Sequence, residues 1–106
     1  ELQKGDVFHN GHWVDIKASE WKTAKLIYPV EKQWRCKADY LCLVTVFRNE
    51  CMIRGFASKE NFMASDNIGN IGKSRDLYIM KQDRLTFDVP MNHDVYDYLD
   101  PRNGEG

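Results

Sequence analysis

The sequence predicts one domain of the mixed α/β class, in which short helices flank a central sheet of both parallel and antiparallel strands. Asn10-Gly11 stands between two alternating segments, which is the strongest short signal of a β-hairpin. The segment 39–47 is almost continuously apolar, as is typical of a strand buried on both faces. The 106 residues contain no repeat, linker or low-complexity tract, and this length is usual for one domain.

The hairpin is the first element, and its turn predicts its register. Asn and Gly both tolerate the positive φ angles of a type I′ turn, so two residues suffice to reverse the chain. The flanking segments 6–9 and 12–17 then lie side by side. The predicted pairs are His9 with His12, Phe8 with Trp13, Val7 with Val14, Asp6 with Asp15, and Lys4 with Lys17.

The rest of the chain predicts short elements separated by turns. Pro29 must interrupt any helix in the segment 18–37, which is hard to interpret. Ser58 is a good N-cap because its hydroxyl can accept a backbone hydrogen bond in the first turn of a helix. The predicted elements are a helix capped by Ser19 and running to Lys25, a short helix or turn over 31–37, strands over 39–47, 51–57 and 76–81, a helix from Ser58 to Ala64, a loop over 65–74 and a helix from His93 to Leu99.

Charge is unevenly distributed along the chain. The net charge is −1, which argues weakly against nucleic-acid binding, but residues 17–37 contain six basic side chains against two acidic ones. Such a stretch either follows a phosphate backbone or is a solvated face. The candidate phosphate contacts are Lys22, Lys25, Lys32 and Arg35. Trp21 and Trp34 alternate with them and either stack on DNA or belong to the core.

The cysteines and the hydropathy pattern indicate a cytoplasmic protein. Three cysteines without a Cys-x-x-Cys spacing argue against a disulfide framework or a structural zinc site, and favour buried thiols in a reducing compartment. No apolar run approaches the ~20 residues that span a bilayer, and no signal peptide opens the sequence. We therefore expect no membrane partner.

The predicted hairpin register places two carboxylates on one face. Directly opposed like charges destabilise a strand pair, whereas a bound cation would explain them. Mg²⁺ takes one or two protein carboxylates and keeps water or phosphate oxygens for its other positions. Asp6, Asp15 and the carbonyl of Ile16 are the expected ligands, and Lys17 beside them would orient or deprotonate an attacking water. The alternative is a surface hairpin whose carboxylates pair with Lys4 and Lys17.

The segment from Asp6 to Lys17 resembles the active-site hairpin of the PD-(D/E)XK nuclease superfamily, which includes restriction enzymes, Holliday-junction resolvases and small phage and intron-associated endonucleases. Asp6 matches the first acidic residue, Asp15 the second and Lys17 the lysine of that motif, and the resemblance covers residues 4–64. It implies a restriction-endonuclease-like fold over 1–106. The family usually has a helix before the first acidic strand, but five residues precede Asp6. We expect this helix to be missing or replaced by a later segment or a neighbouring subunit.

The resemblance implies a Mg²⁺-dependent endonuclease, with Mn²⁺ as a substitute, that hydrolyses DNA phosphodiester bonds. Cutting both strands of a duplex usually needs two sites, so we expect a homodimer. The expected location is the cytoplasm of a bacterium or of a phage-infected cell. One alternative is an inactive nuclease-fold module that binds nucleic acid or a protein. A further alternative is a redox or zinc protein that uses the histidines and cysteines.

Overall fold

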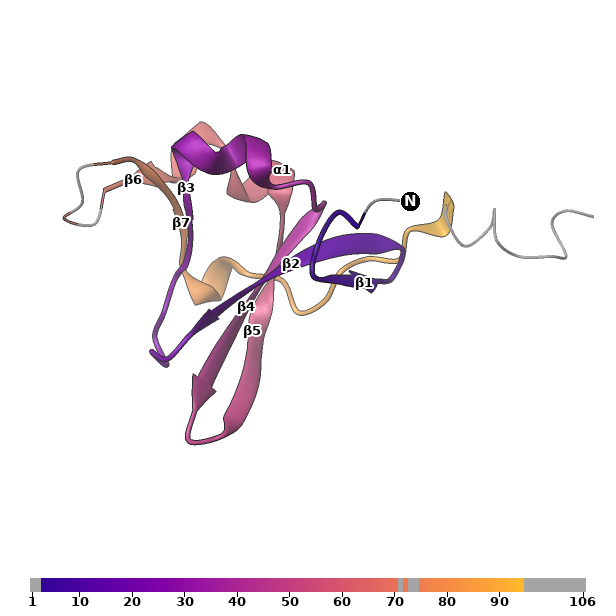
Figure 1. The fold of residues 1–106 in the computed structure, drawn as a ribbon, viewed down its shortest axis with the longest axis horizontal. Helices are drawn as coiled ribbons and strands as arrows, with labels where there is room; N and C mark the ends of the chain where they lie inside the picture. The colour runs from indigo at the N-terminus through magenta and orange to yellow at the C-terminus, as the bar shows by residue number, and fades with distance from the viewer. Residues whose placement is uncertain (1–2, 71, 73–74, 95–106) are drawn as a thin grey trace, which may run out of the picture.

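The computed structural model describes residues 3–70, 72 and 75–94, which form two sheets and a few short helical segments (Figure 1). The strands are β1 (Val7–His9), β2 (His12–Ser19), β3 (Leu26–Pro29), β4 (Tyr40–Phe47), β5 (Glu50–Ser58), β6 (Ile68–Gly69) and β7 (Leu77–Met80). The helical segments are the α-helix α1 (Lys59–Phe62) and the 3₁₀ segments η1 (Val30–Arg35), η2 (Ser65–Asn67) and η3 (Gln82–Arg84). The mixed class is confirmed, and the second sheet was not predicted.

The hairpin of β1 and β2 begins the first sheet, whose strand order is β1-β2-β4-β5. Asn10 and Gly11 have φ angles of 52° and 81°, as a type I′ turn requires. The three predicted pairs from His9–His12 to Val7–Val14 are confirmed. The strand pairing ends at Val7, one residue short of Asp6.

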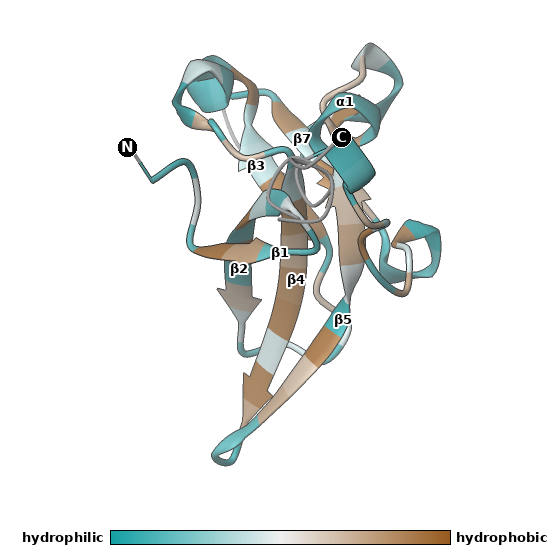
Figure 2. Ribbon diagram, turned by 90° about the vertical axis from the view of Figure 1, so that its right-hand side faces the viewer, coloured by the Kyte–Doolittle hydropathy of each residue, from teal (hydrophilic) through white to brown (hydrophobic). Residues whose placement is uncertain are grey.

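Strand β4 is the centre of this sheet, parallel to β2 and antiparallel to β5. Leu41, Cys42 and Leu43 are buried in succession, which confirms a strand covered on both faces. Figure 2 shows β4 as hydrophobic along most of its length. Arg48 and Asn49, with φ angles of 51° and 66°, turn the chain into β5.

The main core lies between the two sheets and α1. Its buried members are Leu26, Tyr28, Cys36, Ala38, Leu41, Leu43, Ala57, Phe62, Met63, Tyr78 and Met80. A smaller cluster on the other face of the first sheet contains Val14, Cys42, Phe56 and Val89. Side chains from β2 therefore reach a core on either face, according to the alternation along the strand.

The structure differs most from the prediction between residues 18 and 29. The predicted helix from Ser19 to Lys25 is wrong, because β2 continues beside β4 as far as Ser19 and the chain then forms a loop. The hydroxyl of Ser19 accepts the amide of Trp21 at 3.2 Å instead of capping a helix. Strand β3 was not predicted, and it tolerates Pro29 because it is the edge strand of the order β3-β7-β6.

The remaining predicted elements are confirmed with altered bounds: the strand predicted over 51–57 is one residue longer at each end, and the others are shorter. η1 fills most of the segment predicted as a helix or turn, and β7 fills the predicted strand over 76–81. α1 is capped as predicted, since the Ser58 hydroxyl accepts the Asn61 amide at 3.1 Å. The predicted loop over 65–74 also contains η2 and β6. The last predicted helix begins at His93, and its part from 95 onward lies outside the described residues.

No helix within the described ranges is long and apolar enough to cross a membrane.

The cysteines are free thiols, and burial raises the pKa of Cys42 to about 11. Cys36 and Cys42 are buried as predicted, whereas the prediction for Cys51 is wrong. Cys51 is exposed because the end of the β4–β5 hairpin, opposite Val46, extends past the core.

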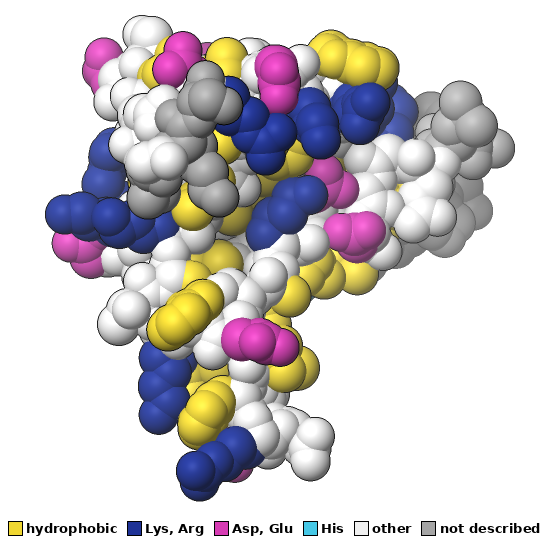
Figure 3. Space-filling model, turned by 60° about the vertical axis from the view of Figure 1, so that its left-hand side comes forward, with side chains coloured by type: hydrophobic (Ala, Val, Ile, Leu, Met, Phe, Trp, Pro, Cys, Tyr) yellow, Lys and Arg dark blue, Asp and Glu magenta, His cyan; other side chains and the backbone are white. Residues whose placement is uncertain are grey.

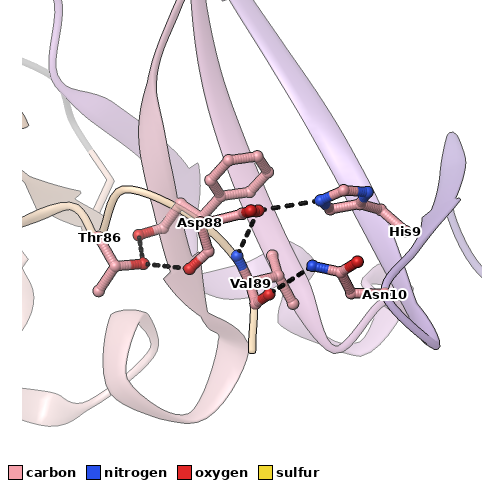
Figure 4. Close-up of polar contacts among 6 residues, drawn as sticks. His9, Asn10, Thr86, Asp88 and Val89 are labelled. Carbon is pink, nitrogen blue, oxygen red and sulfur yellow. Dashed lines mark hydrogen bonds and ion pairs between the residues drawn. The ribbon is translucent and has the colours of Figure 1, made fainter. Parts of the chain in front are cut away.

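Residues 85–92, here called the C-terminal strap, cross β5 and fasten the hairpin turn (Figure 4). Thr86 and Phe56 exchange two backbone hydrogen bonds of 2.9 and 2.7 Å. The Asn10 side chain donates to the carbonyl of Val89 at 2.7 Å, and the Asn92 amide donates to the carbonyl of Asn10 at 2.8 Å. The turn of the first hairpin is therefore fixed by residues near the end of the described chain.

The strap also contains an ion pair whose strength depends on pH. Nε2 of His9 lies 2.9 Å from Oδ1 of Asp88, and this contact, together with the amide of Val89, lowers the pKa of the Asp88 carboxyl. A lowered folded-state pKa stabilises the fold above the unfolded value of about 4, and the effect disappears as the pH falls through the folded value. We expect Asp88→Asn to reduce the loss of stability below about pH 4, measured by urea unfolding between pH 3 and 7. Asp83→Asn, at an exposed position, is the control, and equal slopes for Asp88→Asn and wild type would contradict the prediction.

Candidate active site

Asp15 and Lys17 both lie on the face of β2 that contacts the main core. Trp13, two residues before Asp15, packs against that core and meets Phe8 edge-on, with ring centroids 5.2 Å apart. Asp15 contacts Cys36, and Lys17 contacts Tyr28, and both partners belong to the core cluster. Side-chain alternation in the predicted register puts Lys4, Asp6, Phe8, Trp13, Asp15 and Lys17 on one face, and these contacts confirm it for Phe8, Trp13, Asp15 and Lys17.

Asp15 is half-buried between groups that stay protonated. The Cys36 thiol donates to Oδ2 of Asp15 at 3.5 Å. Burial, and next the charge of Asp15, raise the pKa of Cys36. The pKa of Tyr28 is also raised, first by burial and then by negative charge at Cys36 and Asp15, while Arg35 acts in the opposite direction. The Cys36 thiol and the Tyr28 hydroxyl therefore stay protonated at neutral pH.

The ammonium of Lys17 lies over the ring of Tyr28, with Nζ 5.0 Å from the ring centroid. This cation–π contact fixes the direction of a half-exposed side chain. Tyr28 comes from β3, in the second sheet, so the sequence analysis did not identify it. The short apolar run from Leu26 to Tyr28 was the available signal in the sequence.

Asp6 is held against β2 by its side chain rather than by strand pairing. Its amide donates to the carbonyl of Val14 at 2.9 Å, and its Oδ2 accepts the amide of Ile16 at 2.7 Å. The predicted pairing of Asp6 with Asp15 is therefore wrong, because the chain leaves the ladder here. The amide and carbonyl of a residue in a strand point the same way, so the Ile16 carbonyl points to the edge occupied by Asp6. Gly5 permits this path, since a Cβ there would lie 3.0 Å from the Val14 carbonyl oxygen.

Two substitutions distinguish the hydrogen bond that Asp6 accepts from the negative charge that it carries. Asp6→Ala removes the acceptor of the Ile16 amide, and we expect a loss of about 1 kcal/mol in the free energy of unfolding. Asp6→Asn keeps an oxygen acceptor in the same place and should keep the stability of the wild type. Urea unfolding of both variants measures the difference. Equal stability of the two variants would show that this hydrogen bond does not contribute.

The two carboxylates have no basic partner in the described part of the chain: the ion pairs there involve His9, His12 and Arg75, and none includes Asp6 or Asp15. The alternative of a hairpin neutralised by Lys4 and Lys17 is therefore not what the structure shows. One oxygen of Asp6, the Asp15 carboxylate and the Ile16 carbonyl remain as hard oxygen donors.

The predicted phosphate contacts lie on two segments, the loop that follows β2 and the 3₁₀ segment η1. Lys22 and Lys25 are exposed in the loop that follows β2. Arg35 ends η1, where its guanidinium lies over the ring of Trp34 at 5.1 Å, and Lys32 is half-buried on the same segment. Figure 3 shows Lys and Arg side chains gathered across one face, with a few acidic side chains among them.

Trp34 and Trp21 are exposed, at 67% and 76% respectively. The alternative that these two residues belong to the core is therefore wrong. In the sequence, each of these tryptophans is followed directly by a basic residue, Lys22 or Arg35.

His9 and His12 lie on the other face of the hairpin, as predicted. His9 stacks on Phe56 and His12 meets Tyr40 edge-on, at centroid distances of 6.1 and 4.9 Å. Nδ1 of His12 is 3.5 Å from Oδ2 of Asp39. Within the described ranges, no three His, Cys, Asp or Glu side chains form a cluster.

Comparisons of the chain with protein-family models, with curated proteins and with solved structures found no match. Any functional assignment therefore depends on the chemistry of the hairpin and its surroundings.

Proposed function

We propose that this protein is a metal-dependent endonuclease of the restriction-endonuclease-like kind, which hydrolyses phosphodiester bonds in DNA. The observation that carries the proposal is the arrangement around Ile16. Asp6 is fixed beside this residue, and Asp15 and Lys17 flank it in the sequence and share the core-facing side of β2. Each carboxylate accepts one hydrogen bond within the fold, but neither forms an ion pair among the described residues. Their oxygens are therefore available to a bound cation.

The oxygen donors of this site fit Mg²⁺, which prefers few carboxylates and retains water and substrate phosphate as further ligands. Asp6, Asp15 and the Ile16 carbonyl would hold the ion, and Mn²⁺ would be accepted by the same donors. A bound ion of this kind lowers the pKa of a coordinated water and neutralises charge on the phosphate.

Lys17 supplies the positive charge that the carboxylates lack. Its ammonium is held over the Tyr28 ring, so the side chain is already directed before substrate arrives. In that position it would orient the attacking water and stabilise charge that develops on the phosphate oxygens. Lys22, Lys25, Lys32 and Arg35 would contact phosphates farther along the DNA.

A single copy of so small a domain offers one such site, and cleavage of a duplex needs one for each strand. We therefore include a homodimer in the proposal, with the second copy covering the hairpin edge where the family usually has a helix. The location that fits a DNA-cleaving enzyme of this kind is the cytoplasm of a bacterium or of a phage-infected cell.

The direct test is incubation of supercoiled plasmid DNA with the protein in Mg²⁺, in Mn²⁺ and in EDTA. We expect nicked and linear products in either metal and none in EDTA. Retained DNA binding without cleavage in any divalent metal would favour the second function, a nuclease-fold module that binds nucleic acid, for which the exposed Trp21 beside basic residues is the supporting observation.

A further inference from the structure

Trp21 is held in solvent by an ordered loop. The Ser19 hydroxyl accepts its amide at 3.2 Å, and its carbonyl accepts the amide of Ala24 at 3.0 Å. The side-chain amide of Gln82 donates to the carbonyls of Lys22 and Ala24, at 2.8 and 2.9 Å, and so anchors the loop to η3. Burying a tryptophan is among the larger hydrophobic contributions available to a fold, yet 76% of this one is exposed. An indole presented from a fixed loop backbone, with the exposed Phe47 lining the same groove, is a candidate binding surface.

Two grooves meet at Trp21. The first, of about 620 Å³, lies between β2 and the start of β3 and is lined by Lys17 and Lys25 as well as by Trp21. The second, of about 350 Å³, lies between the loop and the end of β4 and is lined by Phe47 and Arg48 as well as by Trp21. Trp21 lines both, and the two together are here called the Trp21 groove; its lining runs from Lys17, beside the candidate site, to Arg48 at the tip of the β4–β5 hairpin.

The Trp21 groove is positively charged and aromatic. Among the described residues that line it, Glu20 is the single acidic side chain. Lys22 and Arg48 lie over the ring of Phe47, at 5.0 and 5.1 Å from its centroid. Figure 3 shows hydrophobic side chains next to Lys and Arg side chains in the lower part of that face, where Figure 1 places the β4–β5 hairpin. Cations interleaved with exposed rings are typical of surfaces that bind single-stranded nucleic acid.

We propose that the Trp21 groove binds unpaired nucleotides, with a base stacked on Trp21 and the flanking phosphates bound by Lys17, Lys25 and Arg48. A base inside a duplex has both faces covered by its neighbours, so stacking on an indole requires a nucleotide outside the stack. The inference rests on the proposed function for its catalytic part. A strand that passes Trp21 leads to Lys17, so the substrate class is DNA with a single-stranded segment beside the bond to be cut.

The test is equilibrium binding, by fluorescence anisotropy in EDTA, of a labelled oligothymidine and of a duplex of the same length. We expect the wild type to prefer the single strand. Loss of a stacking platform is worth about 1–3 kcal/mol per base, so Trp21→Ala should weaken single-strand binding about 5- to 150-fold. Trp21→Phe, which keeps a ring, should restore most of the affinity.

Phe87→Ala is the matched control, because the Phe87 ring is also exposed, at 96%, but lies in the C-terminal strap, outside both grooves. We expect it to leave the affinity unchanged. Equal single-strand affinity of Trp21→Ala and wild type would overturn the inference, as would equal losses in Trp21→Ala and Phe87→Ala. Circular dichroism checks that each variant is folded.

The binding experiment tests the Trp21 groove independently of the proposed nuclease activity, because it contains no divalent metal. Single-strand binding that depends on Trp21, together with no cleavage in any metal, would support the groove and overturn the nuclease. Plasmid cleavage together with single-strand binding that does not depend on Trp21 would overturn the inference about the Trp21 groove and still support the nuclease.

Discussion

Asp15→Asn and Lys17→Ala should each lower the rate of Mg²⁺-dependent plasmid cleavage by at least about 100-fold, as the loss of one preorganised electrostatic group does in other enzymes. Asp15→Asn removes a charged oxygen donor but keeps an acceptor for the Cys36 thiol, so the fold should persist. Lys17→Ala removes the ammonium over the Tyr28 ring. Single-turnover cleavage rates, measured with enzyme in excess over plasmid, report the chemical step.

Asp83→Asn and Lys81→Ala are the matched controls for this experiment. Both residues are exposed at η3, outside the candidate site. Their substitutions remove the same charges as Asp15→Asn and Lys17→Ala do. We expect them to cleave as the wild type does. Activity that survives in both Asp15→Asn and Lys17→Ala would contradict the assignment of the site to this hairpin.

Gly55→Ala should lower the free energy of unfolding by about 3 kcal/mol, since it combines backbone strain with overpacking. Gly55 has a φ angle of +146°, which side-chain-bearing residues rarely adopt. A Cβ there would lie 2.5 Å from Cβ of Leu85 and 3.0 Å from the carbonyl oxygen of Thr86. The strap cannot simply move away, because Thr86 exchanges two hydrogen bonds with Phe56. Urea unfolding at neutral pH measures the loss.

Gly72→Ala separates the steric part of this effect from the dihedral part. Gly72 also has a positive φ angle, +59°, but no atom of the described residues lies within 4 Å of a Cβ placed there. We expect this variant to lose about 1 kcal/mol, the typical penalty of a left-handed conformation for alanine. If Gly55→Ala is no more destabilising than Gly72→Ala, the strap does not pack on β5 as described.

Sequence patterns predicted the elements whose signals are local. Asn10-Gly11 fixed the hairpin pairs near the turn, the apolar run identified β4, and Ser58 marked the start of α1. Strand β3 was missed because its partner, β7, lies about 50 residues later, so no local pattern marks the pairing. The mistaken helix from Ser19 to Lys25 has the same cause, since pairing with β4 extends β2 to Ser19.

The candidate site was predicted in part, and the error at Asp6 is instructive. Alternation along β2 correctly placed Asp15 and Lys17 on one face. Extending the hairpin register to Asp6 was wrong because the amide of Ile16 donates to the Asp6 side chain and not to a backbone carbonyl of β1. The alternation of side chains along a strand does not predict such a side-chain hydrogen bond. Tyr28 and Gln82, which fix Lys17 and the Trp21 loop, come from distant segments.

The C-terminal strap determines when the hairpin is completed during synthesis. The ion pair that joins the two lies between residues 79 positions apart, His9 and Asp88. A ribosome emits the chain from its N-terminus at about 5–20 residues per second, so the turn emerges several seconds before the residues that fasten it. The first element made is thus among the last to be secured, and a nascent chain cut short before residue 85 lacks the contacts that fasten its turn at His9 and Asn10.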